Sequence, residues 1–394
     1  MLNKIVFAFS VCLLSFAVNA QTNEITAILH EIEQNNKELQ ALTSLLESNQ
    51  LKLKAGNNLP DPQARAYYLP WGEHNTGDYS EFQVAQSFEF PTVYGARSNL
   101  IDKKQRQIEL AFASKRQEVL LAAKKAILEL VFLNKKMAVE QRREKQAKMV
   151  VDQVQELFER EQIGILEVNK ARIAWMQEQF KVQQIETNRR NIMLHLQNLN
   201  GGVEVTLNEP YYAVNLELTQ MDSIWQNRQL ADPTIKIMKQ QEEITRQQIK
   251  LSKNESLPNL VAGFNYQGVS GANYSGVYGG LSIPLWSNRH KVKAAESKYQ
   301  YQKSYSSVQL LTAYVDFQKQ YNDYQILLSK FQEYQRTLTV LNSDALLFEA
   351  YELGEISFII YYMELQFYRT AFDSMLDMEK QLNQLKAQIM SFEL

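Results

Sequence analysis

The chain has 394 residues and a formal net charge of −2 at pH 7. Such a small net charge argues against a nucleic-acid partner, which proteins capture with a strongly positive surface. Only 14 glycines and 8 prolines are present, and their scarcity indicates a mostly helical chain. A mean hydropathy of −0.37 argues against a helical inner-membrane protein.

Residues 1–20 have the pattern of a cleaved secretory signal. Lys4 provides the positive start, Ile5 to Val18 is apolar, and the segment ends in the small-residue site Val18-Asn19-Ala20. The only cysteine, Cys12, lies inside this segment, so no disulfide or thiolate site is expected in the exported chain. No later apolar run approaches the roughly 18 residues of a transmembrane helix, so any membrane crossing is expected to use β-strands.

A first repeat is expected over residues 21–205. It begins with an amphipathic helix from Thr22 to Leu53, in which apolar residues recur every three or four positions. A β-hairpin is expected at 62–90, because polar and apolar residues alternate along two segments, about Gln63 to Pro70 and Ser80 to Phe90.

A long helical hairpin completes this repeat. Helical spacing of apolar residues runs from Ala96 to a break at Gly164 and then resumes as far as Asn198. At 1.5 Å per residue, a continuous helix before the break would be about 100 Å long. Such a helix is too long to fold back inside one globule.

After a linker at 206–220, a second repeat with the same order is expected over 221–394. Its parts are a helix from Ile224 to Leu251, a β-hairpin at 260–285 with strands at about Val261 to Gly268 and Ser275 to Leu285, and a long helical hairpin that turns near Gly354. In each repeat the strands run through a proline, Pro91 or Pro284, into a helical stretch of roughly a hundred residues.

The turns of the two repeats also match in sequence. Phe158-Glu159 followed by Ile163-Gly164 corresponds to Phe348-Glu349 followed by Leu353-Gly354, at an offset of about 190 residues. The aromatic stripe before the second turn, which includes Phe317 and Tyr324, is interpreted as core packing.

Four strands are too few to enclose a membrane barrel, which needs about eight. An open sheet in lipid would leave backbone groups unsatisfied at its edges, so membrane strands would require several chains to share one barrel. The expected fold class is mainly α with a small β part, a duplicated strand hairpin plus long helical hairpin.

Two segments carry a resemblance to a known family. The first runs from Leu59-Pro60-Asp61-Pro62 to Gln86-Ser87-Phe88-Glu89-Phe90-Pro91, and the second is Tyr351-Glu352-Leu353-Gly354-Glu355-Ile356-Ser357-Phe358. Together with the duplication, they resemble the TolC family of outer-membrane efflux proteins across essentially the whole mature chain. The chain is most similar to the heavy-metal branch typified by CzcC and CusC.

The resemblance implies a homotrimer in outer-membrane lipid, with a 12-stranded β-barrel continuing into a periplasmic α-helical barrel. It implies the exit duct of a tripartite efflux system, which passively conducts heavy-metal cations from a periplasmic membrane-fusion adaptor and an inner-membrane RND-type pump to the exterior. It also implies that the two turns are the adaptor-docking tips, formed by Ile163, Gly164, Ile165, Leu166, Leu353, Gly354, Glu355, Ile356 and Ser357. The chain departs from some relatives in having no lipid-anchor cysteine and no metal-binding cluster.

Acidic residues near these turns are candidates for a cation-selecting periplasmic gate. They are Asp152, Glu156, Glu159, Asp344, Glu349 and Glu352, with Glu161 in the turn itself. The plainer interpretation is a solvated helix face or ion pairs between helices.

No catalytic residue, cofactor or metal site is expected, and the chain is not expected to be an enzyme. Its histidines, His30, His74, His195 and His290, lack the paired spacing of metal ligands. Two alternatives remain open. The same duct could carry drugs, other organic compounds or a type I secreted polypeptide; in a different class, the chain could be a periplasmic coiled-coil adaptor or structural protein.

Overall fold

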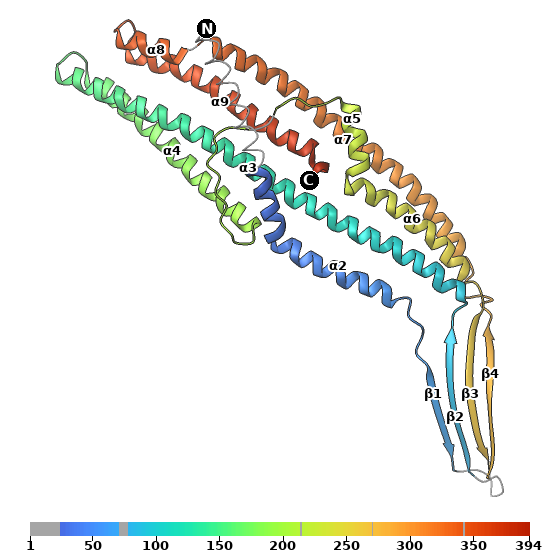
Figure 1. Ribbon diagram of the computed structural model, residues 1–394. Helices are drawn as coiled ribbons and strands as arrows, with labels where there is room; N and C mark the ends of the chain where they lie inside the picture. The colour runs from blue at the N-terminus through green and yellow to red at the C-terminus, as the bar shows by residue number, and fades with distance from the viewer. Residues whose placement is uncertain (1–23, 71–77, 213–214, 270, 342) are drawn as a thin grey trace, which may run out of the picture. The chain divides into compact units, whose positions relative to one another are not determined.

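The computed structural model describes residues 24–70, 78–212, 215–269, 271–341 and 343–394 (Figure 1). The expected signal segment and His74 lie outside these residues. The chain divides into two compact units: unit 1 is Met1–Ala41, Lys115–Ala231 and Tyr314–Leu394, and unit 2 is Leu42–Ser114 and Asp232–Ala313. Each repeat therefore contributes to both units. Within the described residues, every helix lacks an apolar stretch sufficient to cross a membrane.

Unit 2 contains a four-stranded antiparallel sheet in the order β1-β2-β3-β4 (Figure 1). The strands are β1 (Gln63–Leu69), β2 (Tyr79–Phe88), β3 (Asn259–Val269) and β4 (Ala272–Ser282). They lie where the alternation of polar and apolar residues predicted both hairpins. The pairing of β2 with β3, in which Val84 lies opposite Phe264, joins the two repeats in one sheet.

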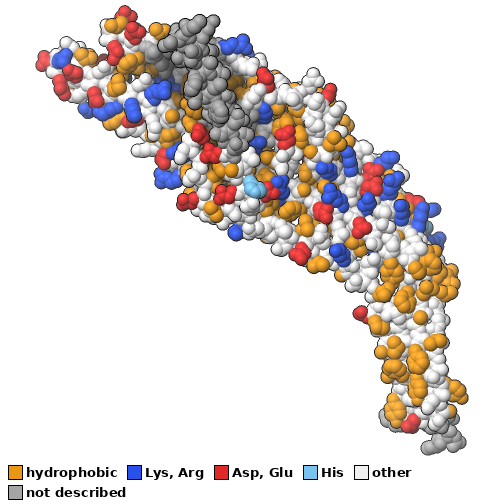
Figure 2. Space-filling model, in the orientation of Figure 1, with side chains coloured by type: hydrophobic (Ala, Val, Ile, Leu, Met, Phe, Trp, Pro, Cys, Tyr) orange, Lys and Arg blue, Asp and Glu red, His pale blue; other side chains and the backbone are white. Residues whose placement is uncertain are grey.

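Large apolar side chains remain exposed along this sheet, and Figure 2 shows hydrophobic side chains gathered over the strands. The exposed set is Tyr67, Tyr68, Leu69, Phe82, Phe264, Val269, Tyr274, Val277 and Leu281. An uncovered apolar surface of this kind marks an interaction with a membrane or with another chain.

The helices of unit 2 are most of α2 (Lys37–Ala55), the first part of α3 (Pro91–Glu159), α6 (Pro233–Asn254) and the first part of α7 (Lys291–Leu341). Val93 and Leu100 of α3 pack with Ile244 and Leu251 of α6 in an apolar core. Pro91 opens α3 at the first helical position, where its missing N–H leaves no hydrogen bond unmade.

The second repeat differs at the equivalent junction. The expected passage through Pro284 straight into a helix is wrong, because α7 begins only at Lys291. His290 precedes it with a φ of 67°, and a backbone in the left-handed region does not continue into a helix.

Two predicted helices are each broken once. The stretch from Thr22 to Leu53 forms a helix over 24–35 and then α2, and the stretch from Ile224 to Leu251 forms α5 (Met221–Ala231) and α6. The Asn36 carboxamide accepts a hydrogen bond of 2.9 Å from the backbone N–H of Leu39, and the Asp232 carboxylate accepts one of 2.8 Å from Thr234. Each break is therefore a new helix start, capped by a polar side chain.

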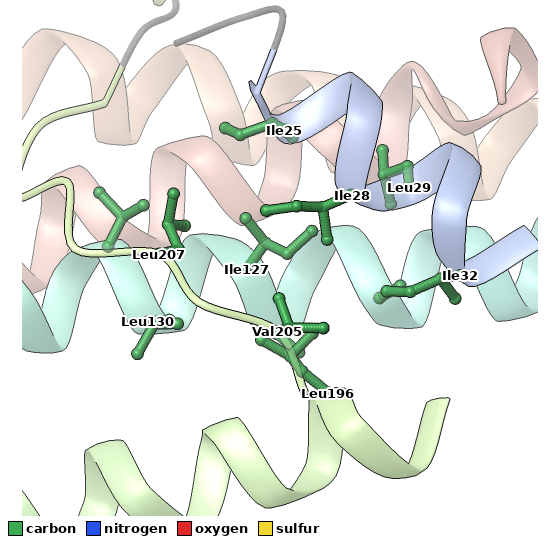
Figure 3. Close-up of a cluster of buried hydrophobic side chains, with 12 residues drawn as sticks. Ile25, Ile28, Leu29, Ile32, Ile127, Leu130, Leu196, Val205 and Leu207 are labelled. Carbon is green, nitrogen blue, oxygen red and sulfur yellow. The ribbon is translucent and has the colours of Figure 1, made fainter. Parts of the chain in front are cut away.

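Unit 1 holds the remaining helices. They are the helix over 24–35, the rest of α3, α4 (Ile165–Leu199), α5, the rest of α7, α8 (Ser343–Glu352), α9 (Phe358–Ile389) and the short η1 (Ser391–Glu393). One core cluster packs Ile28 and Ile32 against Ile127 of α3 and Leu196 of α4 (Figure 3). A second cluster buries Phe317, Tyr324, Leu328, Phe331 and Leu382, which confirms the interpretation of the aromatic stripe as core.

Candidate functional site: the paired helical turns

Each helical hairpin turns with the same backbone hydrogen bonds. In the first turn, the N–H of Gln162 donates to Leu157 O and that of Glu161 to Phe158 O, both at 2.9 Å. In the second turn, the N–H of Glu355 donates to Ala350 O at 2.9 Å and that of Gly354 to Tyr351 O at 3.0 Å. This pair of bonds is the Schellman motif, which satisfies the last carbonyl groups of a helix.

The motif shows which residues of the two turns are equivalent. The left-handed position is occupied by Glu161, with φ 59°, and by Gly354, with φ 74°. The residue that precedes the next helix is Gly164, with an extended backbone, or Ser357, whose hydroxyl accepts a hydrogen bond from Ile360 N–H. The predicted pairing of Gly164 with Gly354 is therefore wrong, because the two glycines stand at different positions of the same turn.

An apolar cluster joins the two hairpins directly behind their turns. Val150, Val151 and Val154 of α3, Val168 and Ala171 of α4, and Tyr361 and Leu365 of α9 are its buried members. Tyr351 of α8 stacks on Tyr361, with ring centroids 5.0 Å apart, and burial raises the pKa of Tyr351. Packing of this kind connects the two hairpins directly behind their turns.

A cavity of about 660 Å³ lies between the turns. Its lining from the first hairpin is Gln153, Val154, Glu156, Leu157, Arg160, Gln162, Ile163, Gly164 and Glu167, and from the second Tyr351, Glu352, Gly354, Ile356 and Ser357. Arg160 forms an ion pair with Glu156 one helical turn earlier. The cavity therefore presents apolar, acidic and hydroxyl groups together, a mixture suited to a protruding segment of another protein.

The predicted tip residues divide into two groups. Ile163, Gly164, Gly354, Ile356 and Ser357 line the cavity. The others, Ile165, Leu166, Leu353 and Glu355, are exposed outside the lining, and Leu166 and Leu353 are 66% and 68% exposed. Folding thus brings both predicted tips to one place. Spacing alone did not identify Gln153, Arg160 and Glu167 as part of the same site.

The candidate gate acids do not gather in one place. Glu156 and Glu352 line the cavity. Asp152 pairs with Lys148 on its own helix, and Glu159 accepts a hydrogen bond from Gln155 at 3.0 Å. Glu349 is exposed, and the side chain of Asp344 lies outside what the structure describes. Among the described residues, no three His, Cys, Asp or Glu side chains are placed to hold a metal ion.

A buried cluster of charges between α3, α4 and α9 was not predicted. Arg143 Nη1 lies 2.7 Å from Glu140 Oε1 and 2.9 Å from Asp373 Oδ1, and Arg369 Nη1 lies 3.1 Å from Glu178 Oε1. Burial raises the pKa of Glu140, against the opposing effect of Arg143. The available signal was spacing: Glu140 follows the stripe residue Met137 by three positions, on the apolar face of its helix.

The sequence matches no family model, and no curated protein matches it significantly. Solved structures do match, across 94% of this chain. CusC, described for its transmembrane channel formation, gives a TM-score of 0.76 at 13% identity over 92% of its own chain. The outer-membrane channel OprN gives a TM-score of 0.75 at 13% identity over 89% of its own chain. The outer-membrane channel MtrE of Neisseria gonorrhoeae, in its open state, gives a TM-score of 0.72 at 12% identity over 88% of its own chain.

OprN and MtrE are described as outer-membrane channels. This chain is mostly helical with one small sheet, so the mainly helical fold that the resemblance predicted is confirmed. The chain has the fold of these outer-membrane channels.

Proposed function

We propose that the chain is a TolC-family subunit of an outer-membrane exit duct, which passes substrate from a periplasmic adaptor and an inner-membrane RND-type pump to the exterior. The observation that carries this proposal is the junction of the two turns around one cavity, in a chain with the fold of outer-membrane channels. A passive duct needs a defined end at which its partner docks, and the paired turns supply one. The chain itself performs no catalysis in this proposal.

The exposed leucines of the turns support a docking role. Leu166 and Leu353 belong to different repeats and are both more than half exposed next to the cavity. Solvent-exposed large apolar groups around a mixed pocket are typical of a surface that another protein covers. The adaptor is therefore expected to place a side chain in the cavity and to cover both leucines.

The sheet supports a shared barrel. β1 and β4 are its edge strands, and each pairs with a neighbour on one side only among the described residues. Lipid cannot satisfy free backbone groups at such edges. If β4 of each copy paired with β1 of the next, three copies would close a 12-stranded barrel. The exposed apolar side chains of the strands would then face lipid.

The cargo proposed is a heavy-metal cation. Support comes from the branch to which the sequence motifs are most similar and from the surplus of acidic side chains around the turns, of which Glu156 and Glu352 line the cavity. Rings of carboxylates favour cations in a pore. Drugs or a secreted polypeptide would pass the same duct if another pump supplied them.

Single-channel recording tests the duct directly. The purified protein, added to a planar lipid bilayer, is expected to give discrete conductance steps, and cations are expected to permeate better than anions. Substituting both Glu156 and Glu352 by Gln should reduce the cation preference without abolishing the steps. A protein that stays soluble without detergent and gives no steps would overturn the proposal and favour the periplasmic adaptor alternative.

A further inference from the structure

A second cavity in unit 1, of about 350 Å³, is distant in sequence from the turns and has no part in the proposed docking. Three elements enclose it. They are α3, the segment that precedes α5, and the end of α9 with η1; the lining residues used below are Lys124, Thr219, Asn383, Lys386, Met390 and Glu393. The remaining lining includes the apolar side chains of Leu128 and Leu218.

Two lysines from different helices line this cavity. Lys386 of α9 is held in place, because its Nζ donates to the backbone oxygens of Asn215 and Glu217. Lys124 of α3 makes no hydrogen bond or ion pair with any residue that the structure describes. Its neighbour Lys125, in contrast, donates to Gln388 Oε1 at 2.8 Å.

The environment of Lys124 is unfavourable for a positive charge. Burial lowers the pKa of Lys124, and Glu393 opposes this effect. Burial also lowers the pKa of Lys386, and the charge of Lys124 lowers it further. Two half-desolvated cations that repel each other are stabilised by an anion between them.

The chain's own acids act on these lysines only from the rim of the cavity. Glu217 and Glu393 are exposed at the rim, and neither makes an ion pair with Lys124 or Lys386 within the part of the chain described. The cavity therefore combines two cationic donors, the hydroxyl of Thr219, the carboxamide of Asn383 and an apolar wall. This combination fits a molecule with an anionic head and a small apolar body.

We propose that this cavity binds a small amphiphilic anion, with a phosphate or carboxylate head bridging Lys124 and Lys386 and an apolar part against Leu128, Leu218 and Met390. Charge-assisted hydrogen bonds from both ammonium groups would hold the head. The site lies within one chain and does not depend on the proposed duct, so either proposal can fail alone.

Calorimetric titration of the purified full-length protein with phenyl phosphate tests the site. Phenyl phosphate should bind more tightly than inorganic phosphate, which lacks the apolar part, and phenol, which lacks the charge, should not bind. Lys124→Met and Lys386→Met should each weaken binding about tenfold or more, because each removes a charged donor. The matched control Lys125→Met, one residue along α3, should leave the affinity unchanged.

Amine labelling provides a second readout. The protein is treated with a limiting amount of acetic anhydride. Phenyl phosphate should slow the acetylation of Lys124 and leave that of Lys125 unchanged. Fragment ions in mass spectrometry distinguish the two lysines. Binding should weaken as the pH rises toward the ordinary lysine pKa, because a lysine whose pKa is lowered by burial loses its charge before an ordinary lysine does. The charged groups facing the two lysines are Glu393 and Glu217, and each lysine also faces the other. Glu393→Gln should tighten binding by removing a competing carboxylate.

Three results would overturn the proposal. One is phenyl phosphate binding no tighter than phenol. Another is equal affinity in the Lys124→Met, Lys386→Met and Lys125→Met variants. The third is that neither the original protein nor Glu393→Gln binds phenyl phosphate at about 10 mM. This concentration would detect even weak association.

Discussion

Glu161 and Gly354 hold the same left-handed backbone conformation with very different side chains. Glycine adopts this conformation freely, whereas a residue with a Cβ atom meets steric strain that costs roughly 1–2 kcal/mol. The first turn therefore retains strain at Glu161 that the second turn avoids. Gly164, whose φ is −87°, is not under the same constraint.

We predict that Gly354→Ala lowers the free energy of unfolding by about 1 kcal/mol, because alanine is strained at a φ of 74°. Gly164→Ala should cost less, since its extended backbone accepts alanine; alanine is a poorer N-cap than glycine, and the added Cβ would lie 3.2 Å from the end of the Glu167 side chain. Glu161→Gly should stabilise the first turn by relieving its strain. Thermal unfolding of the three variants in detergent measures these differences.

Equal losses in Gly164→Ala and Gly354→Ala would contradict the assignment of the two positions. Such a result would favour the predicted equivalence, in which Gly164 and Gly354 occupy the same position of the two turns.

At the scale of the elements, the helical turns act as a pair. Tyr351 and Tyr361 stack behind the second turn, and Val168 of the first hairpin belongs to the same buried cluster. A change on the outer surface of a turn leaves this cluster intact. Docking can therefore be tested without disturbing the fold.

We predict that Leu166→Ser and Leu353→Ser each weaken binding of the periplasmic adaptor about tenfold or more, because large apolar anchors carry much of an interface's affinity. Their effect on stability should stay within about 0.5 kcal/mol, as for other exposed positions. Leu194→Ser is the matched control, since Leu194 lies on α4 and is 59% exposed but lines neither turn. Surface plasmon resonance with immobilised adaptor measures the affinity.

The docking assignment fails if Leu194→Ser weakens adaptor binding as much as the turn variants do. It also fails if both turn variants bind the adaptor normally.

Sequence periodicity predicted the elements well but not their interruptions. The alternation along Ser80 to Phe90 located β2, because half-buried strands repeat every two residues. The break at Asp232 was missed because apolar spacing continues across it, although Asp232-Pro233 is a recognised helix start. The break at Asn36 had a weaker signal, since its cap depends partly on a hydrogen bond from the Asn36 side chain to the distant Leu199 O.

The positions of the two helical turns were predictable from the sequence, but their backbone geometry was not. Its two turns were identified from interruptions in long helices, which is a local signal. The left-handed Glu161 was not, because sequence spacing contains no φ angle and glutamate gives no indication of one. The cavity likewise depends on packing between hairpins that are far apart in sequence, as shown by Glu156 and Glu352 on its lining.

At the scale of the whole molecule, the open edges of the sheet imply further copies of the chain. We predict that cysteines placed on both edges cross-link three chains into a closed ring. One cysteine replaces Ala66 in β1, and the other is scanned through Gly276, Val277 and Tyr278 in β4, with Cys12 replaced by Ser. Oxidation in the membrane should give covalent trimers at one register, because a disulfide requires Cα atoms about 4.4–6.8 Å apart.

The control cysteine replaces Ala85 of β2, which pairs with neighbours on both sides within its own chain. It should form no bond between chains. Ladders extending beyond three chains, or no cross-link at any scanned position, would contradict the closed trimer.

The pairing of β2 with β3 at the centre of the sheet also implies an order in which parts of the chain fold. β2 must find β3, yet α3, α4, α5 and α6 lie between them in the chain. Closing so long a segment is entropically costly and slow, whereas each helical hairpin forms from nearby residues. The hairpin of β1 and β2 therefore emerges first and waits, with Tyr67, Tyr68 and Phe82 uncovered. During export the free backbone edge of β2 is therefore the part of this hairpin most open to wrong pairing, and pairing with β3 covers that edge.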